Sequence, residues 1–443
     1  MTPLYPYQAS AIGKIAAGDK PMLNAFDPGL GKSRVALSVL YAKGFRRVLI
    51  FCPSSVLLVW EAEVRKWWGG MDVTIVRPSS AIPAKEGLFL VSYGLVSEAS
   101  GATTKLLEKT TPFDACVIDE VHYLKNPRAN RSKRIFDLLK AGKLGWVHPM
   151  SGTPAPNNAS ELWGMLYHLR PDTIVSPVNG KPMREGEFVA RYCTVDQFKV
   201  NGGRHWVTRI TGSKNKDELR ERIAPMVLRA RKKDVLPDLP PLDFVVLPVK
   251  AEMPESFDRL GRLDRLDDDD ELLAELASGA AKSEIQGLGL AKIPAVVEWI
   301  ADLLDSDPKR RLVVWAMHHR VIDSYVGLLA QYSPVKLDGR DSLEARRVAI
   351  DRFMTKQARV FIGQIQAGGT GLTLVSLTAP CSDVIFAESS FSWTDNVQAA
   401  CRIHRIGQMD GVLARYASAA GTLDDRIQEI LARKSRDWVE VFG

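Results

Sequence analysis

The chain has 443 residues, of which 46% are hydrophobic and 25% are charged, which is an ordinary composition for a globular protein. Its length exceeds what one hydrophobic core usually supports, so we expect two domains of roughly 200 residues each. No apolar run approaches the roughly 20 residues that cross a bilayer, and the first residues lack the basic start and apolar stretch of a secretion signal. We therefore expect an intracellular protein without a membrane partner.

The charge balance indicates what kind of partner to expect, and the cysteines indicate whether to expect disulfides or a metal site. Lys and Arg exceed Asp and Glu by seven, and the pI is near 9.0, which suits a polyanion such as nucleic acid. The five cysteines form no Cys-x-x-Cys pair, so we expect buried reduced thiols rather than disulfides or a zinc site. They are Cys52, Cys116, Cys193, Cys381 and Cys401.

A glycine-rich loop precedes a helix-like run near the start of the chain: Asp27-Pro28-Gly29-Leu30-Gly31-Lys32-Ser33. Its glycines allow backbone N–H groups to close around phosphate oxygens at a helix N-terminus. Lys32 would reach the β- and γ-phosphates, and the Ser33 hydroxyl would bind Mg²⁺. The strict phosphate-loop pattern requires glycine where this chain has Phe26, but Gly31-Lys32-Ser33 is retained.

Short apolar runs that follow the loop predict strands at 47–51, 88–91 and 115–118. Residues 56–67 have the apolar spacing of a helix. Trp60, Trp67 and Trp68 could stack on bases, but their spacing favours packing in the core. Strands that alternate with helices imply a parallel sheet covered on both faces.

Two adjacent carboxylates, Asp119 and Glu120, close the third of these runs. Asp119 would hold Mg²⁺ through water, and Glu120 would orient and deprotonate the water that attacks the γ-phosphate. Alone, such a pair is as often a solvated strand end. In the same α/β unit as the phosphate loop, it predicts a site that hydrolyses a nucleoside triphosphate.

The middle of the chain has a different character, and the alternation of strands and helices then restarts. Residues 171–215 are rich in Gly, Pro, Asn and basic residues, and residues 252–290 are helical and charged. The acidic run 267–271 is interpreted as a solvated helix start. A second α/β unit is predicted after residue 295. Its strands are expected at 311–315, 359–362 and 383–386, and its helices near 292–305, 319–332 and 342–355.

The motifs together resemble those of the SNF2 family of superfamily 2 helicase-like ATPases. The phosphate loop and the Asp119-Glu120 pair resemble motifs I and II, and residues 119–126 carry the Asp-Glu-x-His signature with the Lys-Asn extension of that family. Residues 4–8 resemble its adenine-reading segment, 151–154 motif III, 226–241 the bridge between lobes, 368–373 motif V and 398–408 motif VI. The resemblance covers nearly the whole chain in the family's order.

This resemblance implies an α/β fold of two tandem RecA-like domains, with parallel sheets flanked by helices and helical insertions between them. We expect the first, ATP-binding lobe at 1–235, with a family insertion at about 171–225. A linker and helical protrusion would follow at 236–295, and the second lobe would occupy 296–443.

The resemblance also implies ATP and Mg²⁺ as cofactors. The expected catalytic residues are Lys32, Glu120, Arg402 and Arg405. The expected nucleotide contacts are Tyr5, Gln8, Pro28, Gly29, Leu30, Gly31, Lys32, Ser33, Asp119 and Gly371, with Ser33 and Asp119 on Mg²⁺. The Gln8 amide has a donor and an acceptor for an adenine edge. Arg402 and Arg405 would share a face if helical, and could meet the γ-phosphate from the opposite lobe.

DNA contacts or coupling roles are implied for Pro53, Ser54, Ser92, Tyr93, Ser151, Thr153, Gly368, Gly369 and Thr370. Contacts through amides and hydroxyls position a protein on DNA but read no sequence. The Ser92-Tyr93 pair could also be an ordinary strand end.

Within the family, residues 188–193, 385–388 and 371–373 resemble the fork-remodelling, annealing-helicase branch. We therefore expect an ATP-dependent translocase that remodels double-stranded or branched DNA in repair or replication. Alternatives are a strand-separating helicase, with a hairpin at 196–206 as its wedge, and a motor subunit that displaces DNA-bound proteins. We expect a monomer that works with replication or recombination proteins. Its location would be the cytoplasm of a bacterium or virus-infected cell, or the nucleus of a eukaryote.

Overall fold

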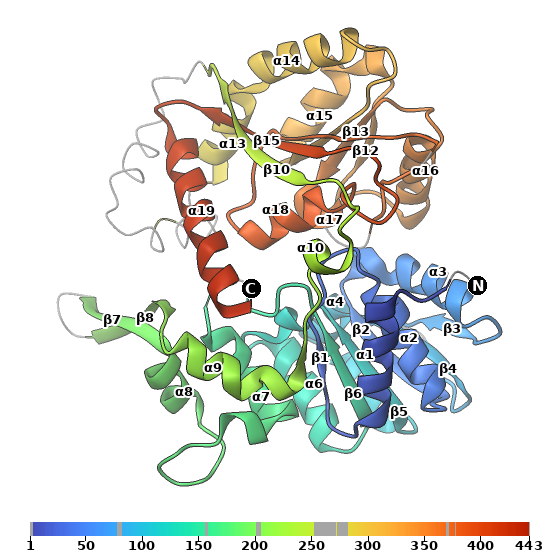
Figure 1. The fold of residues 1–443 in the computed structure, drawn as a ribbon, viewed down its shortest axis with the longest axis vertical. Coiled ribbons are helices and arrows are strands. Elements are labelled where there is room, and N and C mark those ends of the chain that lie inside the picture. Colours follow the sequence, from blue (N-terminus) through green and yellow to red (C-terminus); the bar gives the residue numbers. More distant parts are fainter. Residues whose placement is uncertain are drawn as a thin grey trace. The chain divides into compact units, whose positions relative to one another are not determined.

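The computed structural model describes residues 3–77, 82–155, 158–200, 205–251, 272, 282–368, 372–376 and 378–442. The chain divides into two compact units, which we call the first unit (1–235 with 437–443) and the second unit (236–436). Each has its own sheet of parallel strands with helices on both faces (Figure 1). The predicted fold class is confirmed. Within the described ranges, every helix is too short or too polar to span a bilayer.

The sheet of the first unit has the strand order β3-β4-β2-β5-β6-β1-β9, and all of its pairings are parallel. Its strands are β1 (Leu23–Asn24), β2 (Arg47–Cys52), β3 (Val73–Ile75), β4 (Gly87–Ser92), β5 (Phe113–Asp119), β6 (Leu144–Met150) and β9 (Val227–Leu228). Every residue of β2 and β4 is buried. Such complete burial is typical of a parallel sheet that is covered on both faces.

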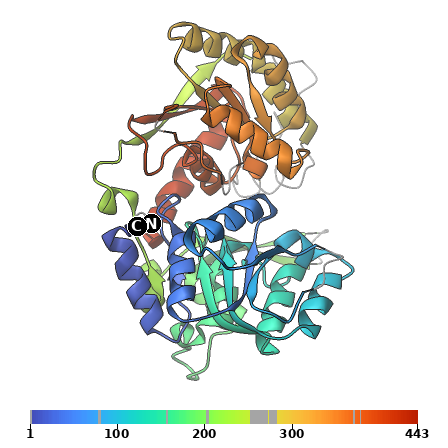
Figure 2. The same cartoon turned by 90° about the vertical axis from the view of Figure 1, so that its right-hand side faces the viewer.

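Helices α2 (Lys32–Ala42) and α3 (Leu57–Trp67) cover one face of this sheet. Helix α1 (Pro6–Ala17) packs along α2 (Figure 2). The helices of the opposite face are α4 (Tyr93–Ser97), α5 (Ala102–Lys109), α6 (Asn130–Lys140), α7 (Ser160–Leu169), α8 (Glu185–Tyr192) and α9 (Lys216–Ile223). Short turns of 3-10 helix connect these elements at η1 (Ser54–Val56), η2 (Val121–Leu124), η3 (Pro171–Ile174) and η4 (Ala224–Met226).

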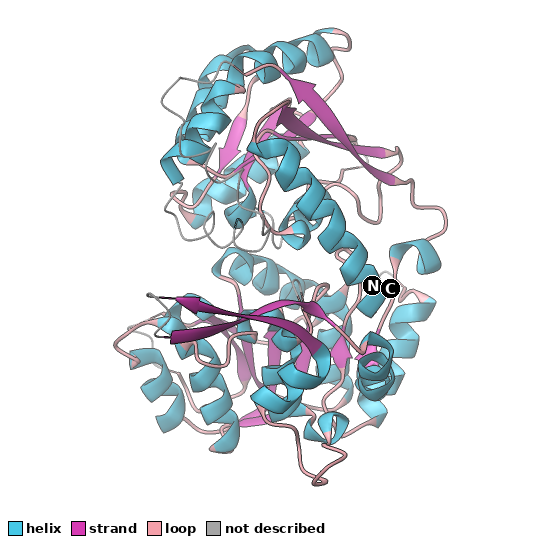
Figure 3. Ribbon diagram, turned by 90° about the vertical axis from the view of Figure 1, so that its left-hand side faces the viewer, coloured by secondary structure: helices cyan, strands magenta, loops and turns pink. Residues whose placement is uncertain are grey.

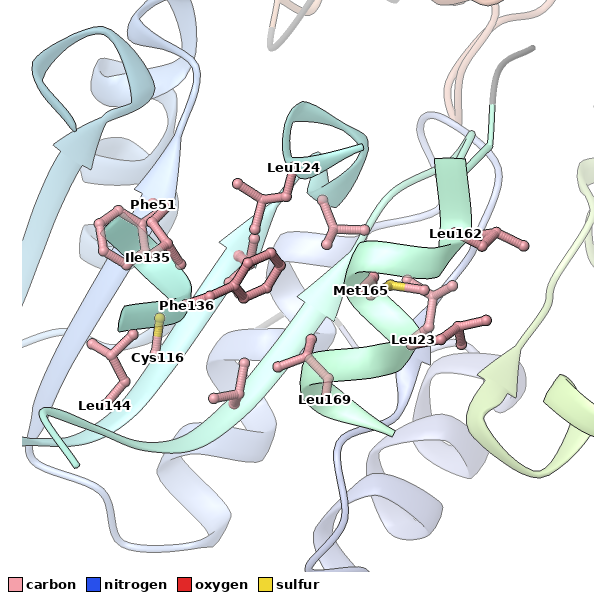
Figure 4. Packing of buried hydrophobic residues seen from close by; sticks show 14 of the residues in the cluster. Leu23, Phe51, Cys116, Leu124, Ile135, Phe136, Leu144, Leu162, Met165 and Leu169 are labelled. Atoms are coloured by element: carbon pink, nitrogen blue, oxygen red, sulfur yellow. The ribbon is translucent and has the colours of Figure 1, made fainter. Parts of the chain in front are cut away.

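The two cores of the first unit follow from the alternation of side chains along each strand. In β2, Val48 and Ile50 face α2 and α3, whereas Leu49 and Phe51 face the opposite helices. Figure 4 shows part of the second core, where α6 and α7 cover the strands. The labelled side chains are Leu23, Phe51, Cys116, Leu124, Ile135, Phe136, Leu144, Leu162, Met165 and Leu169.

The predicted family insertion contains a two-stranded antiparallel hairpin of β7 (Cys193–Val200) and β8 (His205–Ser213), as Figure 3 shows. The hairpin predicted at 196–206 is therefore confirmed, with strands that are longer than expected. Residues 201–204, which join the strands, lie outside the described residues.

The sheet of the second unit has the parallel order β10-β15-β14-β11-β13-β12. Helices α14 (Ile293–Asp305) and α15 (His319–Leu328) pack on one face, and α16 (Leu343–Met354), α17 (Ile365–Gly368) and α18 (Trp393–Ala400) on the other. The strands are β10 (Leu242–Val249), β11 (Leu312–Ala316), β12 (Val335–Leu337), β13 (Val360–Gln364), β14 (Asp383–Phe386) and β15 (Val412–Ala419). The remaining elements are α10 (Lys232–Val235), α13 (Lys282–Ala291), η5 (Ala330–Tyr332) and α19 (Leu423–Phe442).

The segment between the two predicted lobes differs in part from its sequence expectation. The range 236–295, expected as a linker with a helical protrusion, contributes strand β10, which pairs with β15 along its whole length. Its half-exposed pattern and its Pro248 are typical of an edge strand, and they obscured the strand in the sequence. Most of the protrusion, including the acidic run 267–271, lies outside the described residues. All five cysteines are buried and unbridged, as predicted.

Candidate nucleotide site

The predicted residues of the first unit gather at one edge of its sheet. Carboxyl ends of parallel strands meet at the same edge, which is where ligands bind in open α/β sheets. The phosphate loop follows β1, Ser54 follows β2, and Ser92 ends β4. Asp119 ends β5, and the segment from Ser151 to Thr153 follows β6.

The phosphate loop has the backbone that its glycines predict. Gly29 and Gly31 have φ angles of 93° and 81°, in the left-handed region that favours glycine. A Cβ atom at Gly31 would lie 2.5 Å from Gln8 Nε2, so the position also lacks space. Gly31 precedes α2 and supplies no side-chain cap. The first N–H groups of α2 can therefore serve phosphate oxygens.

Lys32 lies between the phosphate loop and the segment after β6. Its Nζ donates to the carbonyl of Phe26 at 3.1 Å, and a Cβ at Gly152 would lie 3.3 Å from the same Nζ. Phe26 occupies the position of the missing glycine, where its ring is buried edge-on against Tyr7 at 5.6 Å. Phe26, which departs from the strict pattern, therefore packs beside the loop.

The N-terminal segment is bound to the phosphate loop through one carbonyl. Gln8 Nε2 and the Tyr7 hydroxyl both donate to the Leu30 carbonyl at 3.1 Å. Gln8 Oε1 accepts from the Tyr5 backbone N–H at 3.2 Å, and the Tyr5 and Tyr7 rings stack at 5.7 Å. Tyr7 was not among the predicted contacts. The role of Gln8 in reading adenine stays a prediction.

Asp119 is 7% exposed, and hydrogen bonds hold both its carboxylate and its carbonyl. Trp60 Nε1 donates to Oδ2 at 2.8 Å, and the Tyr93 hydroxyl donates to the carbonyl at 2.6 Å. Burial and the adjacent charge of Glu120 raise the pKa of the Asp119 carboxyl, so a nearby cation would stabilise its charged form. Mg²⁺ takes one or two carboxylates together with phosphate oxygens and water. The Asp119 carboxylate and the Ser33 hydroxyl fit that donor set.

Glu120 has a φ of 52°, a left-handed conformation that is uncommon for a residue other than glycine. The Ser151 hydroxyl donates to Glu120 Oε2 at 3.0 Å. His122 Nδ1 lies 3.0 Å from Ser151 Oγ and 3.3 Å from Glu120 Oε2. Burial would raise the pKa of Glu120, but the hydrogen bond and charge of His122, with the charge of Lys32, hold it below its usual range. Glu120 therefore remains a carboxylate, as a base must.

Burial and hydrogen bonds favour coupling over direct DNA contact for several of the residues predicted to have one of these two roles. Tyr93 is 3% exposed and its hydroxyl serves Asp119, so its side chain is unavailable to DNA. Ser92 is also buried, and it caps α4 by accepting from the Leu95 N–H at 3.4 Å. Ser151 and Thr153 are buried, Ser151 donates to Glu120, and the Thr153 N–H donates to Ser151 Oγ at 3.1 Å, while their coupling role stays a prediction. Pro53 is buried as well, whereas Ser54 is exposed.

A partly buried ion pair at the first residue of the phosphate loop was missed by sequence reasoning. Asp27 binds Arg229 at 2.7 Å and accepts from the Lys232 N–H at 2.9 Å. The Arg229 guanidinium also donates to the Ala25 carbonyl. These residues follow β1 and β9, which are neighbours in the sheet but lie far apart in the sequence.

In the second unit, Arg402 and Arg405 lie in turns after α18, not on a helix as their spacing suggested. They still converge, because both guanidinium groups donate to the Leu372 carbonyl, at 3.1 and 2.8 Å. Arg402 is 4% exposed, and Arg405 is more accessible. Gly368 is buried, and a Cβ there would lie 2.9 Å from the Trp315 ring. Gly369, Thr370 and Gly371 lie outside the described residues.

Comparison with known proteins shows the family of the chain. The model of the SNF2-related domain matches residues 21–256, more than half of the chain. The chain belongs to this family. In this SNF2-related chain, the model of the helicase conserved C-terminal domain matches residues 295–407.

Curated relatives match nearly the full length of this SNF2-related chain. It is 28% identical over 458 residues to the SWI/SNF-related matrix-associated actin-dependent regulator of chromatin subfamily A-like protein 1 of Xenopus tropicalis, which covers 99% of this chain and 44% of that protein. It is 28% identical over 450 residues to the DNA annealing helicase and endonuclease ZRANB3 of Mus musculus. That alignment covers 98% of this chain and 40% of the relative. The chain thus spans less than half the length of these relatives. A solved structure, the Sulfolobus solfataricus SWI2/SNF2 ATPase core in complex with dsDNA, aligns at a TM-score of 0.45 and 20% identity over 100% of this chain and 95% of that one.

Proposed function

We propose that the chain is an ATP-dependent DNA translocase that moves on duplex or branched DNA and remodels forks or junctions by annealing or branch migration. The observation that carries the ATPase part is the arrangement of Lys32, Asp119 and Glu120 at one sheet edge, with Ser151 and His122 on the Glu120 carboxylate. The DNA part is supported by family membership and by a relative named as a DNA annealing helicase.

Each residue of the site has a role in this proposal. Lys32 and the start of α2 would hold the β- and γ-phosphates, while Ser33 and Asp119 would hold Mg²⁺. When bound, Mg²⁺ screens charge on the phosphate oxygens. Glu120 would accept a proton from the attacking water, with its carboxylate oriented by Ser151.

Arg405 is the proposed arginine finger, and Arg402 is proposed to position it. Arg402 is the more deeply buried of the two, and both share the Leu372 carbonyl. A finger supplied to the γ-phosphate is typically worth about 10³–10⁵ in turnover. If ATP binding draws the lobes, assigned to 1–235 and 296–443, together and hydrolysis releases them, alternate grips on DNA phosphates become movement.

Glu120→Gln tests the ATPase part directly. The amide cannot accept the proton, so we expect kcat to fall by about 10²–10⁴-fold, while the affinity for a fluorescent ATP analogue with Mg²⁺ stays near the wild-type value. Glu108→Gln, at an exposed position of α5, is the matched control. Wild-type turnover in Glu120→Gln would overturn the assignment.

The DNA part is tested by ATPase rates with single-stranded, duplex, forked and four-way-junction DNA, together with annealing and unwinding assays on labelled strands. A translocase of this kind should be stimulated most by duplex or forked DNA, and it should anneal strands. An ATPase rate that is the same with and without every DNA would refute the proposal.

A strand-separating helicase is the second candidate, because the β7–β8 hairpin could act as a wedge. Asp196 and Arg209 are paired across this hairpin, so residues 197–208 can be replaced by Asn-Gly, the preferred two-residue turn. Loss of unwinding in this variant, with DNA-stimulated ATPase retained, would favour the helicase. Retained annealing without unwinding in either protein favours the translocase.

Partners and location are part of the proposal. We propose a monomer that works in the cytoplasm of a bacterium or virus-infected cell, or in the nucleus of a eukaryote, together with replication or recombination proteins. A pull-down from the native host would also test the third possibility, a motor subunit that displaces DNA-bound proteins.

A further inference from the structure

Residues of two helices, α3 and α4, donate hydrogen bonds to Asp119. Helix α3 follows η1 (Ser54–Val56), in which Ser54 is exposed. Helix α4 begins directly after Ser92. One donor to Asp119 lies on each helix; Tyr93 was predicted as a DNA-contact or coupling residue, and Trp60 was expected only to pack in the core.

On α3, the donor is Trp60. Its side chain is 1% exposed, and its indole N–H reaches Asp119 Oδ2 at 2.8 Å. A bond from a donor to a buried carboxylate is among the stronger hydrogen bonds in proteins. Trp67, on the same helix, donates its indole N–H to Glu63 at 2.8 Å within the helix itself. The indole N–H of Trp60 therefore binds a carboxylate of the site, whereas the indole N–H of Trp67 binds a residue of its own helix.

On α4, the donor is Tyr93. Its hydroxyl reaches the Asp119 carbonyl at 2.6 Å, and its ring stacks on Tyr123 at 4.8 Å with an interplanar angle of 9°. The Tyr123 backbone N–H donates to the Glu120 carbonyl at 2.9 Å. Through these contacts, α4 supports both Asp119 and the left-handed turn that presents Glu120.

We propose that Trp60 and Tyr93 are positioning residues for Asp119, and that Trp60 connects the start of α3, where Ser54 is exposed, to the Asp119 carboxylate, so that a DNA phosphate at Ser54 orients the carboxylate for Mg²⁺. This inference rests on the proposed function. A phosphate at Ser54 would fix the start of α3, and Trp60 lies less than two helical turns further along this rigid element. Loss of a group that orients a metal ligand typically lowers metal affinity or activity by about 10–100-fold.

Trp60→Phe tests the link, because it removes the N–H and keeps an aromatic ring in the core. We expect the Mg²⁺ concentration for half-maximal ATPase to rise about tenfold or more, and the ratio of DNA-stimulated to basal rate to fall. Excess Mg²⁺ should restore the basal rate but not that ratio. Trp67→Phe, the same substitution on the same helix, should leave both quantities unchanged.

A second readout does not depend on turnover. With a non-hydrolysable ATP analogue, added Mg²⁺ should raise the Tm of Trp60→Phe less than it raises the Tm of wild type or Trp67→Phe. If Trp60→Phe does not fold, Tyr93→Phe tests the other arm, because it loses only the hydroxyl and keeps the stacked ring. Exposed Tyr41 supplies its control, Tyr41→Phe.

The outcomes separate this inference from the function on which it rests. Wild type without DNA-stimulated ATPase would refute the proposed function, and the thermal shift would still test the role of Trp60 at Asp119. Stimulated wild type with Trp60→Phe and Tyr93→Phe equal to their controls would overturn the inference alone. A changed Mg²⁺ requirement with an unchanged stimulation ratio would overturn the connection to DNA.

Discussion

Glu120 keeps its charge in surroundings that oppose it. Burial disfavours the carboxylate, but His122, Lys32 and the Ser151 hydroxyl stabilise it, and the net effect is a pKa below the usual range. The backbone of Glu120 is strained in this position, because a left-handed φ costs about 1–3 kcal/mol in a residue other than glycine. A strained residue with a perturbed pKa is expected where function requires a particular geometry.

The pH profile of the ATPase reports on this environment. His122→Gln removes the leading group that lowers the pKa of Glu120, so that pKa should rise. Because the base must be deprotonated, activity on the acid side should then be lost at a higher pH than in wild type. The measurement is kcat at saturating Mg²⁺ over a pH range that extends on the acid side below 4.5, the ordinary pKa of a glutamate carboxyl. His168→Gln, on α7 against Phe136, is the control. An acid limb that does not move would contradict the role of His122.

At the scale of elements, the phosphate loop depends on contacts from both sides. Strands β1 and β9 have two residues each, too few to hold a loop by their ladder alone. Gln8 of α1 binds the loop at Leu30, and Arg229 binds it at Asp27. The loop is therefore positioned by distant segments as much as by its own glycines.

Breaking the Asp27–Arg229 pair should affect both stability and binding. Arg229→Met leaves a partly buried carboxylate without its guanidinium partner, so we expect the free energy of unfolding to fall by about 1–3 kcal/mol. Affinity for ATP should weaken as well, because the loop loses its support. Urea unfolding and nucleotide titration measure the two effects. Asp27→Asn combined with Arg229→Met should cost less than the sum of the single changes. Additive costs would show that the pair is not coupled.

At the scale of the whole molecule, each unit has its own sheet and its own cores. A chain built in this way is not expected to unfold in a single two-state transition. In the first unit, burial lowers the pKa of His148 in β6 and of His168 in α7 to about 4. Both side chains are therefore neutral in the folded protein at neutral pH.

Because the folded chain keeps these histidines neutral, we expect the free energy of unfolding of the first unit to fall in acid. The unfolded chain takes up a proton at His148 near its ordinary pKa of 6.5, but the folded chain does so only near 4. Between these values the unfolded state binds more protons, so stability falls as the pH falls. From pH 7 to pH 5 the loss from His148 should be about 2 kcal/mol. His148→Leu cannot titrate, and its Tm should change less over this range. Parallel curves for wild type and variant would contradict the prediction.

Much of the fold and half of the site were predictable from the sequence. The strand and helix pattern follows from the periodicity of apolar residues, and Lys32, Asp119 and Glu120 belong to motifs that are contiguous in the chain. The edge strand β10 escaped notice because half of its residues are exposed. Arg402 and Arg405 share the Leu372 carbonyl through turns, which residue spacing does not reveal.

The chemistry of the site could be read from short stretches of sequence, because a phosphate loop and a strand-ending pair of acids need only local backbone geometry. Which distant groups hold those residues became evident only from the packing of the folded chain. Trp60 and Trp67 stand on one helix, yet one binds Asp119 and the other binds Glu63. The physical reason is that a buried polar group needs a donor within about 3 Å, and only packing brings residues from separate elements that close.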